Sequence, residues 1–284
     1  MKKSVLFLLV FLTFCVAGHA QTEEQILRPV TAAYTFGIGS SHLADTYLSP
    51  INYNGWSASF DYNRWQAMKA SPESWLMNLN FGIEIDRGLN RVGNAVMWYA
   101  GFNASWGVLR RWNIVKGLKI GVGPIANIDL GALYLNRNSN NPVSAKAALT
   151  VGANGFAAYN LRIGRLPVTL LWQPTLPVVG AFFSPDYGEL YYEIYLGNHN
   201  GLAHCAWWGN YFRLDNSVTA DLHFGATALR IGYRGEILST KVNHLVSNHF
   251  THRFVIGISG EWLSLNPRKT LSPKAKTYHA LYNF

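Results

Sequence analysis

Over many successive segments of the sequence, side chains alternate between apolar and polar with a period of two residues. In the clearest segment, 75–86, Trp, Met, Leu, Phe and Ile fill the odd positions, while Asn, Gly, Glu and Asp fill most of the even ones. The pattern recurs in 54–66, 94–110, 228–240 and 250–264. Because side chains on a strand point alternately to opposite faces, this pattern predicts a chain of amphipathic β-strands.

The composition of the two faces separates a membrane barrel from a soluble sandwich. The polar faces are rich in Gly and Asn, and aromatic residues lie near the strand ends. Charged residues make up only 14% of the chain, where a soluble domain carries about 25%. Apolar residues facing outward and polar residues facing inward are typical of outer-membrane barrels. We therefore favour a barrel over a soluble sandwich, in which the apolar face would be the core.

Counting the alternating segments gives ten strands. We expect them at 30–40, 54–66, 73–86, 94–110, 115–135, 145–163, 165–173, 216–224, 228–240 and 250–264. Every second connection is short, as in bacterial barrels, which have short periplasmic turns and longer outer loops. The sequence therefore predicts an all-β, antiparallel transmembrane β-barrel at 30–264, with a long structured extracellular loop at 174–215.

Two further segments alternate, and they leave a barrel of twelve strands as the alternative. These are 190–196 and 277–284, the second of which ends on Phe like the C-terminal assembly signal of outer-membrane proteins. Twelve strands would turn the short connection 225–227 into an outer loop, against the usual asymmetry. Ten strands are therefore favoured, with 265–284 as a C-terminal tail.

The first twenty residues predict export. Lys2 and Lys3 precede the apolar run 5–17, and small residues at 18 and 20 fit a cleavage site after Ala20. A membrane anchor is the alternative, but the run is short for one. Residues 21–29 then form a periplasmic lead-in. Removing the two Lys leaves 22 bases against 15 acids, a net charge of +7.

That charge and the predicted location indicate the partners. We expect contact with outer-membrane lipid, and lipopolysaccharide is a second candidate because a basic surface favours anionic lipid or polysaccharide. A secreted chain without a basic cluster is not expected to bind nucleic acid.

Charged residues on the polar faces are expected to line the lumen. They balance at seven acids against six bases, which predicts an ion-pair network filling a small barrel, with a narrow mixed-charge pore as the alternative. The expected set is Asp61, Glu84, Asp86, Lys119, Asp129, Lys146, Arg162, Asp221, Arg230, Arg234, Glu236, Arg253 and Glu261.

Four residues are candidates for catalysis. Asp221 and His223 share a strand face, so the carboxylate could orient a general base. His199 and His204 lie in the long loop beside Cys205 and could serve a metal or a nucleophile. Their spacing matches no zinc motif, and the His-x-Ser arrangement of outer-membrane phospholipases is missing. We therefore assign no metal and no cofactor.

Three stretches of the sequence resemble one protein family. They are ELYYEI at 189–194 with LGN at 196–198, TALRIGYRG at 227–235, and TKVN at 240–243 followed by TH at 251–252 and FVIG at 254–257. These look like domain-of-unknown-function family 3316, a group of uncharacterised secreted proteins. The similarity covers roughly 25–265. It implies an outer-membrane barrel and brings no activity and no site residues.

Together these observations predict a non-enzymatic envelope protein: a small channel, a surface-binding protein or a structural barrel. The alternative is a lipid- or glycan-modifying outer-membrane enzyme, with a site between loop 174–215 and the upper lumen. The prolines and aromatic residues of that loop predict that it folds against the barrel mouth. Tryptophans are expected in two girdles at the strand ends, at Trp56, Trp75, Trp106, Trp112, Trp172 and Trp262.

Overall fold

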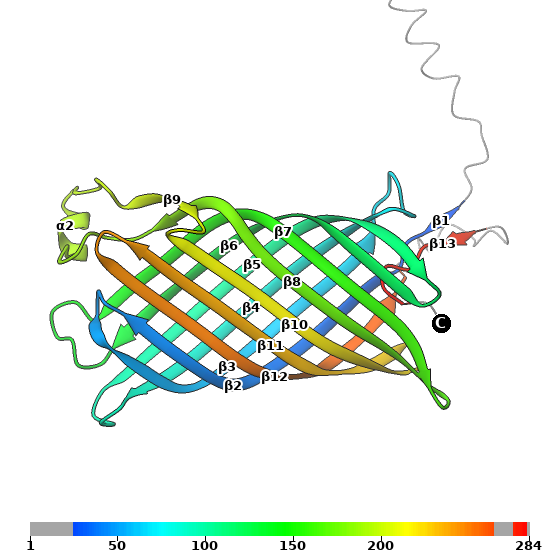
Figure 1. The fold of residues 1–284 in the computed structure, drawn as a ribbon, viewed down its shortest axis with the longest axis horizontal. Coiled ribbons are helices and arrows are strands. Elements are labelled where there is room, and N and C mark those ends of the chain that lie inside the picture. The colour runs from blue at the N-terminus through cyan, green and yellow to red at the C-terminus, as the bar shows by residue number, and fades with distance from the viewer. Residues whose placement is uncertain (1–24, 264–274, 283–284) are drawn as a thin grey trace, which may run out of the picture. The chain divides into compact units, whose positions relative to one another are not determined.

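Ten long antiparallel strands form a closed barrel in the computed structural model, which describes residues 25–263 and 275–282 (Figure 1). The strands are β2 (Val30–Asp45), β3 (Ser49–Ala67), β4 (Trp75–Asn90), β5 (Val96–Val115), β6 (Leu118–Leu135), β7 (Val143–Ile163), β8 (Leu166–Phe183), β10 (Tyr211–Phe224), β11 (Thr227–Val242) and β12 (Leu245–Trp262). The ring closes because β12 pairs with β2 and β10 pairs with β8. The predicted ten-strand barrel is confirmed.

Several predicted features fall outside the described residues. They are the signal peptide at 1–20, the first part of the lead-in at 21–24, residues 265–274 of the C-terminal tail, and the terminal Phe284. A short parallel pair, β1 (Ile26–Leu27) with β13 (Lys276–Thr277), is a small unit by itself.

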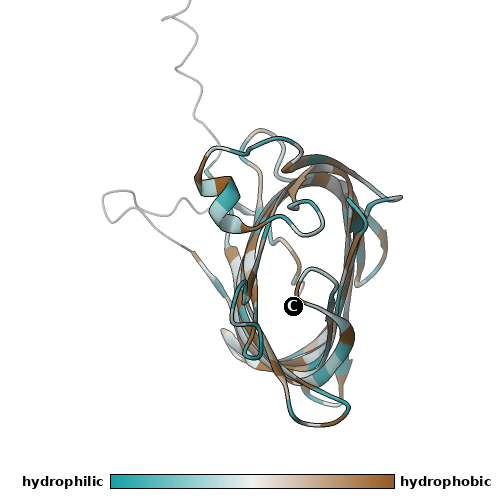
Figure 2. Ribbon diagram, turned by 90° about the vertical axis from the view of Figure 1, so that its left-hand side faces the viewer, coloured by the Kyte–Doolittle hydropathy of each residue, from teal (hydrophilic) through white to brown (hydrophobic). Residues whose placement is uncertain are grey.

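The two ends of the barrel differ in their connections. At one end, here called the turn end, β5–β6, β7–β8 and β10–β11 are joined by two residues each, and β3–β4 by 68–74. At the other, the loop end, the connections include 136–142 and 184–210. Seen from the loop end, α2 (Tyr191–Tyr195) lies over one side of the rim (Figure 2). The expected asymmetry is therefore present, although most loop-end connections are shorter than expected.

The outer wall of the barrel exposes apolar side chains. On β4, Phe81, Ile83 and Ile85 expose 40%, 56% and 51% of their surface. In a soluble monomer so large a patch would be unusual, whereas a lipid-facing band requires it. The band also includes Tyr34, Phe36, Ile38, Phe60, Phe102, Ile128, Leu130, Leu149, Val151, Leu170, Val218, Ile256 and Ile258.

Aromatic residues mark both edges of this band. Arg87 pairs in register with Trp56 on one side and Trp98 on the other, and its guanidinium lies 5.7 Å from the Trp98 ring centroid. At the turn end, Trp75 pairs with Arg110. The twelve residue-to-residue steps of β4 from Trp75 to Arg87 span about 40 Å along the strand, or about 30 Å after a 35–45° tilt. That distance suits the apolar thickness of a membrane.

Some of the expected girdle tryptophans lie elsewhere. Trp262 ends β12 at the turn end, as expected. Trp106, however, pairs with Leu79, four residues inside the Trp75 row. Trp172 pairs with Val218 in the middle of β10. The girdles are thus carried by a subset of the predicted residues.

Inward-facing residues change in kind from one end of the barrel to the other. Along β4 the order is Leu76, then Asn78 and Asn80, then Glu84 and Asp86. Antiparallel pairing places similar residues of the neighbouring strands at the same height, since Asn63 pairs with Asn80. The lumen is therefore layered from the turn end: an apolar cluster, a layer of amides, a layer of charges and a second apolar cluster.

The twelve-strand alternative fails at both extra segments. Residues 190–196 contain the helix α2, where the Glu193 carboxylate accepts from the backbone N–H of Leu190. Gly188 and Gly197 flank it with φ of +82° and +108°, values that end an extended or helical run. Residues 278–282 form no strand and lie inside the lumen, where they pack against the inner wall.

The long loop is shorter than expected, because β8 continues to Phe183 and β10 begins at Tyr211. Pro177 is tolerated in β8 because it faces Gly152 at a bulge. Within the remaining connection, β9 (Ala203–Trp207) pairs with the loop-end part of β8. The Tyr47 hydroxyl also donates to the Glu189 carbonyl at 2.7 Å. The loop is therefore docked onto the barrel.

Candidate functional site

The charged layer at mid-lumen contains the main cluster of functional groups. Arg213 on β10 reaches both Asp129 on β6 and Glu236 on β11, and its Nη2 lies 2.7 Å from Glu236 Oε1. All three side chains are largely buried, at 9%, 16% and 2% exposed. The Arg213 guanidinium thus links β6 to β11, two strands that do not pair with each other.

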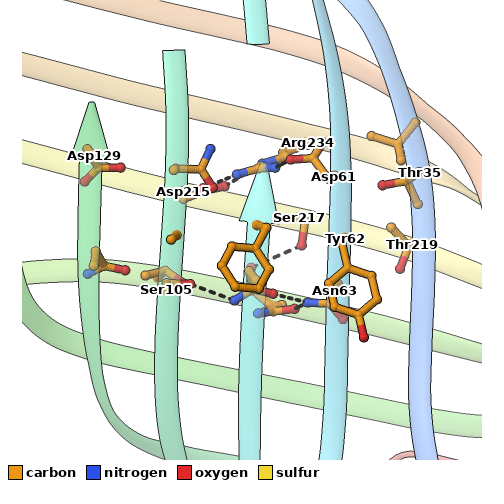
Figure 3. Close-up of a pocket in the computed structure, with 18 of the residues that line it drawn as sticks. Thr35, Asp61, Tyr62, Asn63, Ser105, Asp129, Asp215, Ser217, Thr219 and Arg234 are labelled. Atoms are coloured by element: carbon orange, nitrogen blue, oxygen red, sulfur yellow. Dashed lines mark hydrogen bonds and ion pairs between the residues drawn. The ribbon is translucent and has the colours of Figure 1, made fainter. Parts of the chain in front are cut away.

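A second guanidinium lies beside the first. Arg234 binds both oxygens of Asp215, with Nε 3.0 Å from Oδ1 and Nη2 2.6 Å from Oδ2. Its Nη1 also binds Asp61 on β3, three strands away around the wall. Figure 3 shows Arg234 between these two carboxylates. A fork-shaped donor set of this kind suits two carboxylates at once.

A third guanidinium completes the layer towards the loop end. Arg253 is 1% exposed; it binds Glu84, and its Nε donates to Ser57 Oγ at 2.7 Å. At the next height, the imidazole of His249 contacts Asp86. These contacts tie β12 to β3 and β4 across the lumen.

The charged layer does not balance. Three guanidiniums and one imidazole face six carboxylates, which belong to Asp61, Glu84, Asp86, Asp129, Asp215 and Glu236. Among the described residues, Asp86 Oδ1, Asp129 Oδ2 and Glu236 Oε2 are buried without a hydrogen-bond partner. The near-neutral lumen expected from the sequence is therefore locally acidic at this height.

A cavity of about 100 Å³ lies between the charged and amide layers (Figure 3). Asp61, Arg213 and Arg234 line its charged side, and Asn63 and Asn127 line its amide side. A single water needs about 10–15 Å³ on this measure, so the cavity has room for several.

Amide side chains form the next layer. Asn78 Oδ1 accepts from Asn80, Asn154 and Gln173 at 2.8, 3.0 and 3.2 Å. Asn63 also donates to Gln173 at 3.3 Å. These residues come from β3, β4, β7 and β8. The network therefore bridges strands that are not neighbours in the wall. The Asn residues on the polar strand faces predict a polar lumen but not these cross-lumen hydrogen bonds.

Residues of the C-terminal tail fill the turn end of the lumen. Arg111 donates to the carbonyls of His279 and Ala280 at 2.6 and 3.1 Å. Lys119 Nζ lies 3.0 Å from the carbonyl of Tyr282. Ala280 and Leu281 are 0% exposed and pack in an apolar cluster with Trp65, Leu76, Leu109, Phe156 and Leu171. The tail is held by both polar and apolar contacts.

The ring of Tyr282 reaches the buried pair Asp221–Arg230. Arg230 binds both carboxylate oxygens, at 2.6 and 2.7 Å, and the Tyr282 hydroxyl donates to Asp221 Oδ2 at 2.7 Å. Burial and the neighbouring carboxylate raise the pKa of Tyr282 above its ordinary value. His223 packs edge-on against the same ring, with the centroids 4.5 Å apart. This group is a structural anchor for the tail.

The four catalytic candidates do not come together. Asp221 and His223 lie near the turn end of β10. His204 lies on β9 at the loop end, where its Nε2 is 3.1 Å from the Ser184 carbonyl, and His199 is exposed in the connection after α2. Tyr211 and Asp221 lie ten positions apart on β10, about 33 Å along the strand. A single site at the upper lumen cannot contain all four.

The residues predicted to line the lumen lie in four different surroundings. Asp61, Glu84, Asp129, Arg234, Glu236 and Arg253 lie in or beside the charged layer, while Glu261 contacts His279 near the tail. Lys146 pairs with Asp45 towards the loop end. Arg162 is exposed at the end of β7, beyond the layers, and makes no ion pair within the described part of the chain.

Arg213 and Asp215 belong to the charged layer but lie outside the predicted lumen set, because the sequence analysis assigns 174–215 to a loop. The signal was present: positions 211, 213 and 215 continue the inward face of the strand that contains Asp221 and His223. Extending that alternation towards the loop end would have found both residues.

Two negative findings apply to residues 25–263 and 275–282. No helix there is both long and apolar enough to cross a membrane. No cluster of three or more His, Cys, Asp or Glu side chains there is arranged to hold a metal ion.

Comparison with known proteins identifies the family. The profile described as "Protein of unknown function (DUF3316)" matches residues 5–269. The chain belongs to this family. The resemblance expected from the sequence is thus confirmed over nearly the whole chain. No protein of curated function matches the DUF3316 chain.

Solved structures similar to this DUF3316 protein are outer-membrane and translocator barrels. The outer membrane protease OmpT from Escherichia coli has 6% identity and a TM-score of 0.42, over 85% of this chain and 98% of that one. The transport unit of the autotransporter AIDA-I from Escherichia coli has 9% identity and a TM-score of 0.41, over 86% and 92%. The translocator domain of NalP from Neisseria meningitidis has 10% identity and a TM-score of 0.36, over 92% and 98%. Likenesses at this level carry no argument about activity.

Proposed function

We propose that this protein is a non-enzymatic barrel of the outer membrane whose lumen is closed to the bulk flow of solutes. The observation that carries the proposal is the tail in the turn end of the lumen, where the backbone carbonyls of 279–282 accept hydrogen bonds from Arg111, Lys119 and Asn160. Behind the tail, side chains fill the lumen layer by layer. The barrel is thereby a structural or surface-binding element of the envelope.

The filled layers explain why closure is stable. Opening the tail would expose the apolar cluster around Leu281 to water and leave Nη1 of Arg111 without its two carbonyl acceptors. Each buried apolar side chain contributes about 1.5–3 kcal/mol. Towards the loop end, Leu43, Tyr53, Met97 and Leu133 form the second apolar cluster. A passage through the whole lumen would have to cross the cluster around the tail.

Placement in the outer membrane is supported by the wall. The aromatic rows about 30 Å apart and the apolar band between them suit a bilayer. Membrane lipid is therefore the main partner. Lipopolysaccharide is a further candidate, because Arg87 lies in the loop-end aromatic row and Arg91 and Arg137 are exposed in loops at the same end. Cationic side chains at this height favour anionic headgroups.

The enzymatic alternative is not favoured by the geometry. A site between the long loop and the upper lumen could include His199 and His204 but not Asp221 and His223, because the barrel places these two pairs at opposite ends. His204 is engaged in holding the loop through Ser184 and Asn243. Asp221 is engaged with Arg230 and Tyr282.

Vesicle swelling tests the proposal. The full chain, refolded into phospholipid vesicles, is diluted into an isotonic solution of arabinose, and light scattering records sugar entry. We expect swelling no faster than in protein-free vesicles, while a general porin in matched vesicles gives a rapid signal. Porin-like swelling by the full chain would overturn the proposed closure.

A further inference from the structure

A second cavity leads from the loop-end rim down to the charged layer. Its volume is about 40 Å³. Ser184, which directly follows β8, and Thr240, two residues before the end of β11, line it near the rim. Asp129 and Glu236 line it at depth. The cavity therefore connects the unbalanced carboxylates with the loop end.

Two of the residues that line this cavity have a carboxylate oxygen without a hydrogen-bond partner in the part of the chain that the structure describes. Glu236 is 2% exposed, and its Oε2 has no hydrogen-bond partner among the described residues. Asp129 Oδ2 is likewise buried without a hydrogen-bond partner among the described residues. The other oxygen of each carboxylate binds Arg213. A buried charged oxygen without a partner is costly, so a cationic donor placed here would relieve two such costs together.

The charge of the missing donor follows from the local balance. Asp129 and Glu236 carry two negative charges against one on Arg213, which leaves one unit to be neutralised. Nearby charges are already paired, Glu84 with Arg253 and Lys146 with Asp45. A monovalent cation fits this deficit, and a divalent ion would add excess positive charge beside a guanidinium.

Aromatic rings give the cavity its chemical preference. Tyr99, Phe182 and Tyr211 are buried and line the cavity, and the rings of Phe182 and Tyr211 lie 5.3 Å apart. Ring faces attract organic cations, and alkyl groups pack well against them. A strongly hydrated inorganic ion has less to gain from such a wall.

We propose that this cavity is a binding site for a small organic ammonium ion. The ammonium group donates to Asp129 Oδ2 and Glu236 Oε2, and its alkyl substituent packs against Phe182 and Tyr211. The site is independent of the tail and of the proposed closure, because it opens towards the loop end. It gives the protein a ligand class that a purely structural barrel would lack.

Saturation-transfer NMR with methylammonium as the probe tests the site on the full chain folded in detergent micelles. We expect a saturable signal from the methyl group and none from methanol, its neutral counterpart. Glu236→Gln and Asp129→Asn should each weaken binding tenfold or more. The matched control Glu261→Gln removes a lumen carboxylate near the tail and should change the affinity less than twofold.

Folding of each variant is checked by the electrophoretic shift of the folded barrel on heating. If a carboxylate variant does not fold, Phe182→Leu keeps every charge and should weaken methylammonium binding about threefold through the lost ring. Three results would overturn the proposal: no saturable binding by the natural chain, equal affinities in Glu236→Gln and Glu261→Gln, or displacement of methylammonium by an equal concentration of sodium. Vesicle swelling stays unaffected by any of these outcomes.

Discussion

The hydroxyl of Tyr282 donates a 2.7 Å hydrogen bond to Oδ2 of Asp221, sixty-one residues away in the sequence. The same carboxylate binds Arg230 through both of its oxygens. The tail is thus attached to an ion pair that already belongs to the barrel wall. Tail docking and wall pairing can therefore be perturbed separately.

Tyr282→Phe should loosen the tail without unfolding the barrel. A hydrogen bond to a charged group contributes about 1.5–3 kcal/mol, and Asp221 keeps Arg230 in the variant. We expect roughly a tenfold rise in tail opening. Ala280→Cys places a thiol at a fully buried site of the tail, in a chain whose exposed Cys205 is replaced by Ser. The rate at which a thiol reagent labels position 280 then measures how often the tail opens.

Tyr278→Phe is the matched control for that experiment. Tyr278 donates to Glu73 at an exposed position, so its removal should change the labelling rate at position 280 much less. Equal labelling rates in the two variants would show that the Tyr282–Asp221 bond does not hold the tail.

Asp221→Asn should destabilise the whole barrel. It leaves the Arg230 guanidinium, 5% exposed, without a charged partner, a change that costs about 3–5 kcal/mol. Urea unfolding in vesicles measures the loss. The double variant Asp221→Asn with Arg230→Met removes the unpaired charge and should recover a large part of the lost free energy of unfolding. A double variant as unstable as the single one would contradict this account of the pair.

Phe81→Arg should interfere with membrane insertion. Phe81 lies six residues from both Trp75 and Arg87 on β4, so it sits near the midplane, where Arg costs about 2–4 kcal/mol. Trp75→Arg, at the aromatic edge, should cost about 0–1 kcal/mol. The free energy of unfolding in vesicles is measured for both. Equal losses at the two positions would argue against the proposed membrane depth.

Docking of the long loop should weaken in strong alkali. Burial raises the pKa of Tyr191 to about 12, while the backbone N–H of Ala145 donates to its hydroxyl. The pKa of Tyr191 in the folded protein lies above its unfolded value near 10. The stabilisation of loop docking by Tyr191 is therefore complete below pH 10 and is lost between pH 10 and 12. Proteolysis of 184–210 should accelerate in that interval. Tyr191→Phe should weaken the dependence and leave the part that comes from Tyr47, whose hydroxyl also holds the loop.

Much of the wall could be predicted from the sequence. Period-two alternation located all ten strands and assigned their outward residues, because each side chain on a strand has only two directions available. The same rule left 190–196 open as an additional strand, but in the structure Glu193 caps a helix there and two glycines adopt positive φ. Alternation over seven residues does not separate a strand from such a helix.

The lumen was less predictable, because its contacts join strands that are far apart in the sequence. Arg213 bridges Asp129 and Glu236 only after the barrel has closed. The tail is recognised mainly through its backbone carbonyls, which have the same chemistry whatever the sequence. Its alternating Tyr278, Ala280 and Tyr282 therefore looked like a strand, although they lie against the inner wall.

Single-channel recording of the full chain in a planar bilayer tests the closed lumen most directly, together with a variant, Leu281→Asp, that places a charge in the apolar cluster around the tail. The account predicts a silent natural chain and discrete current steps from the variant. A large, steady, porin-like current from the natural chain would contradict it.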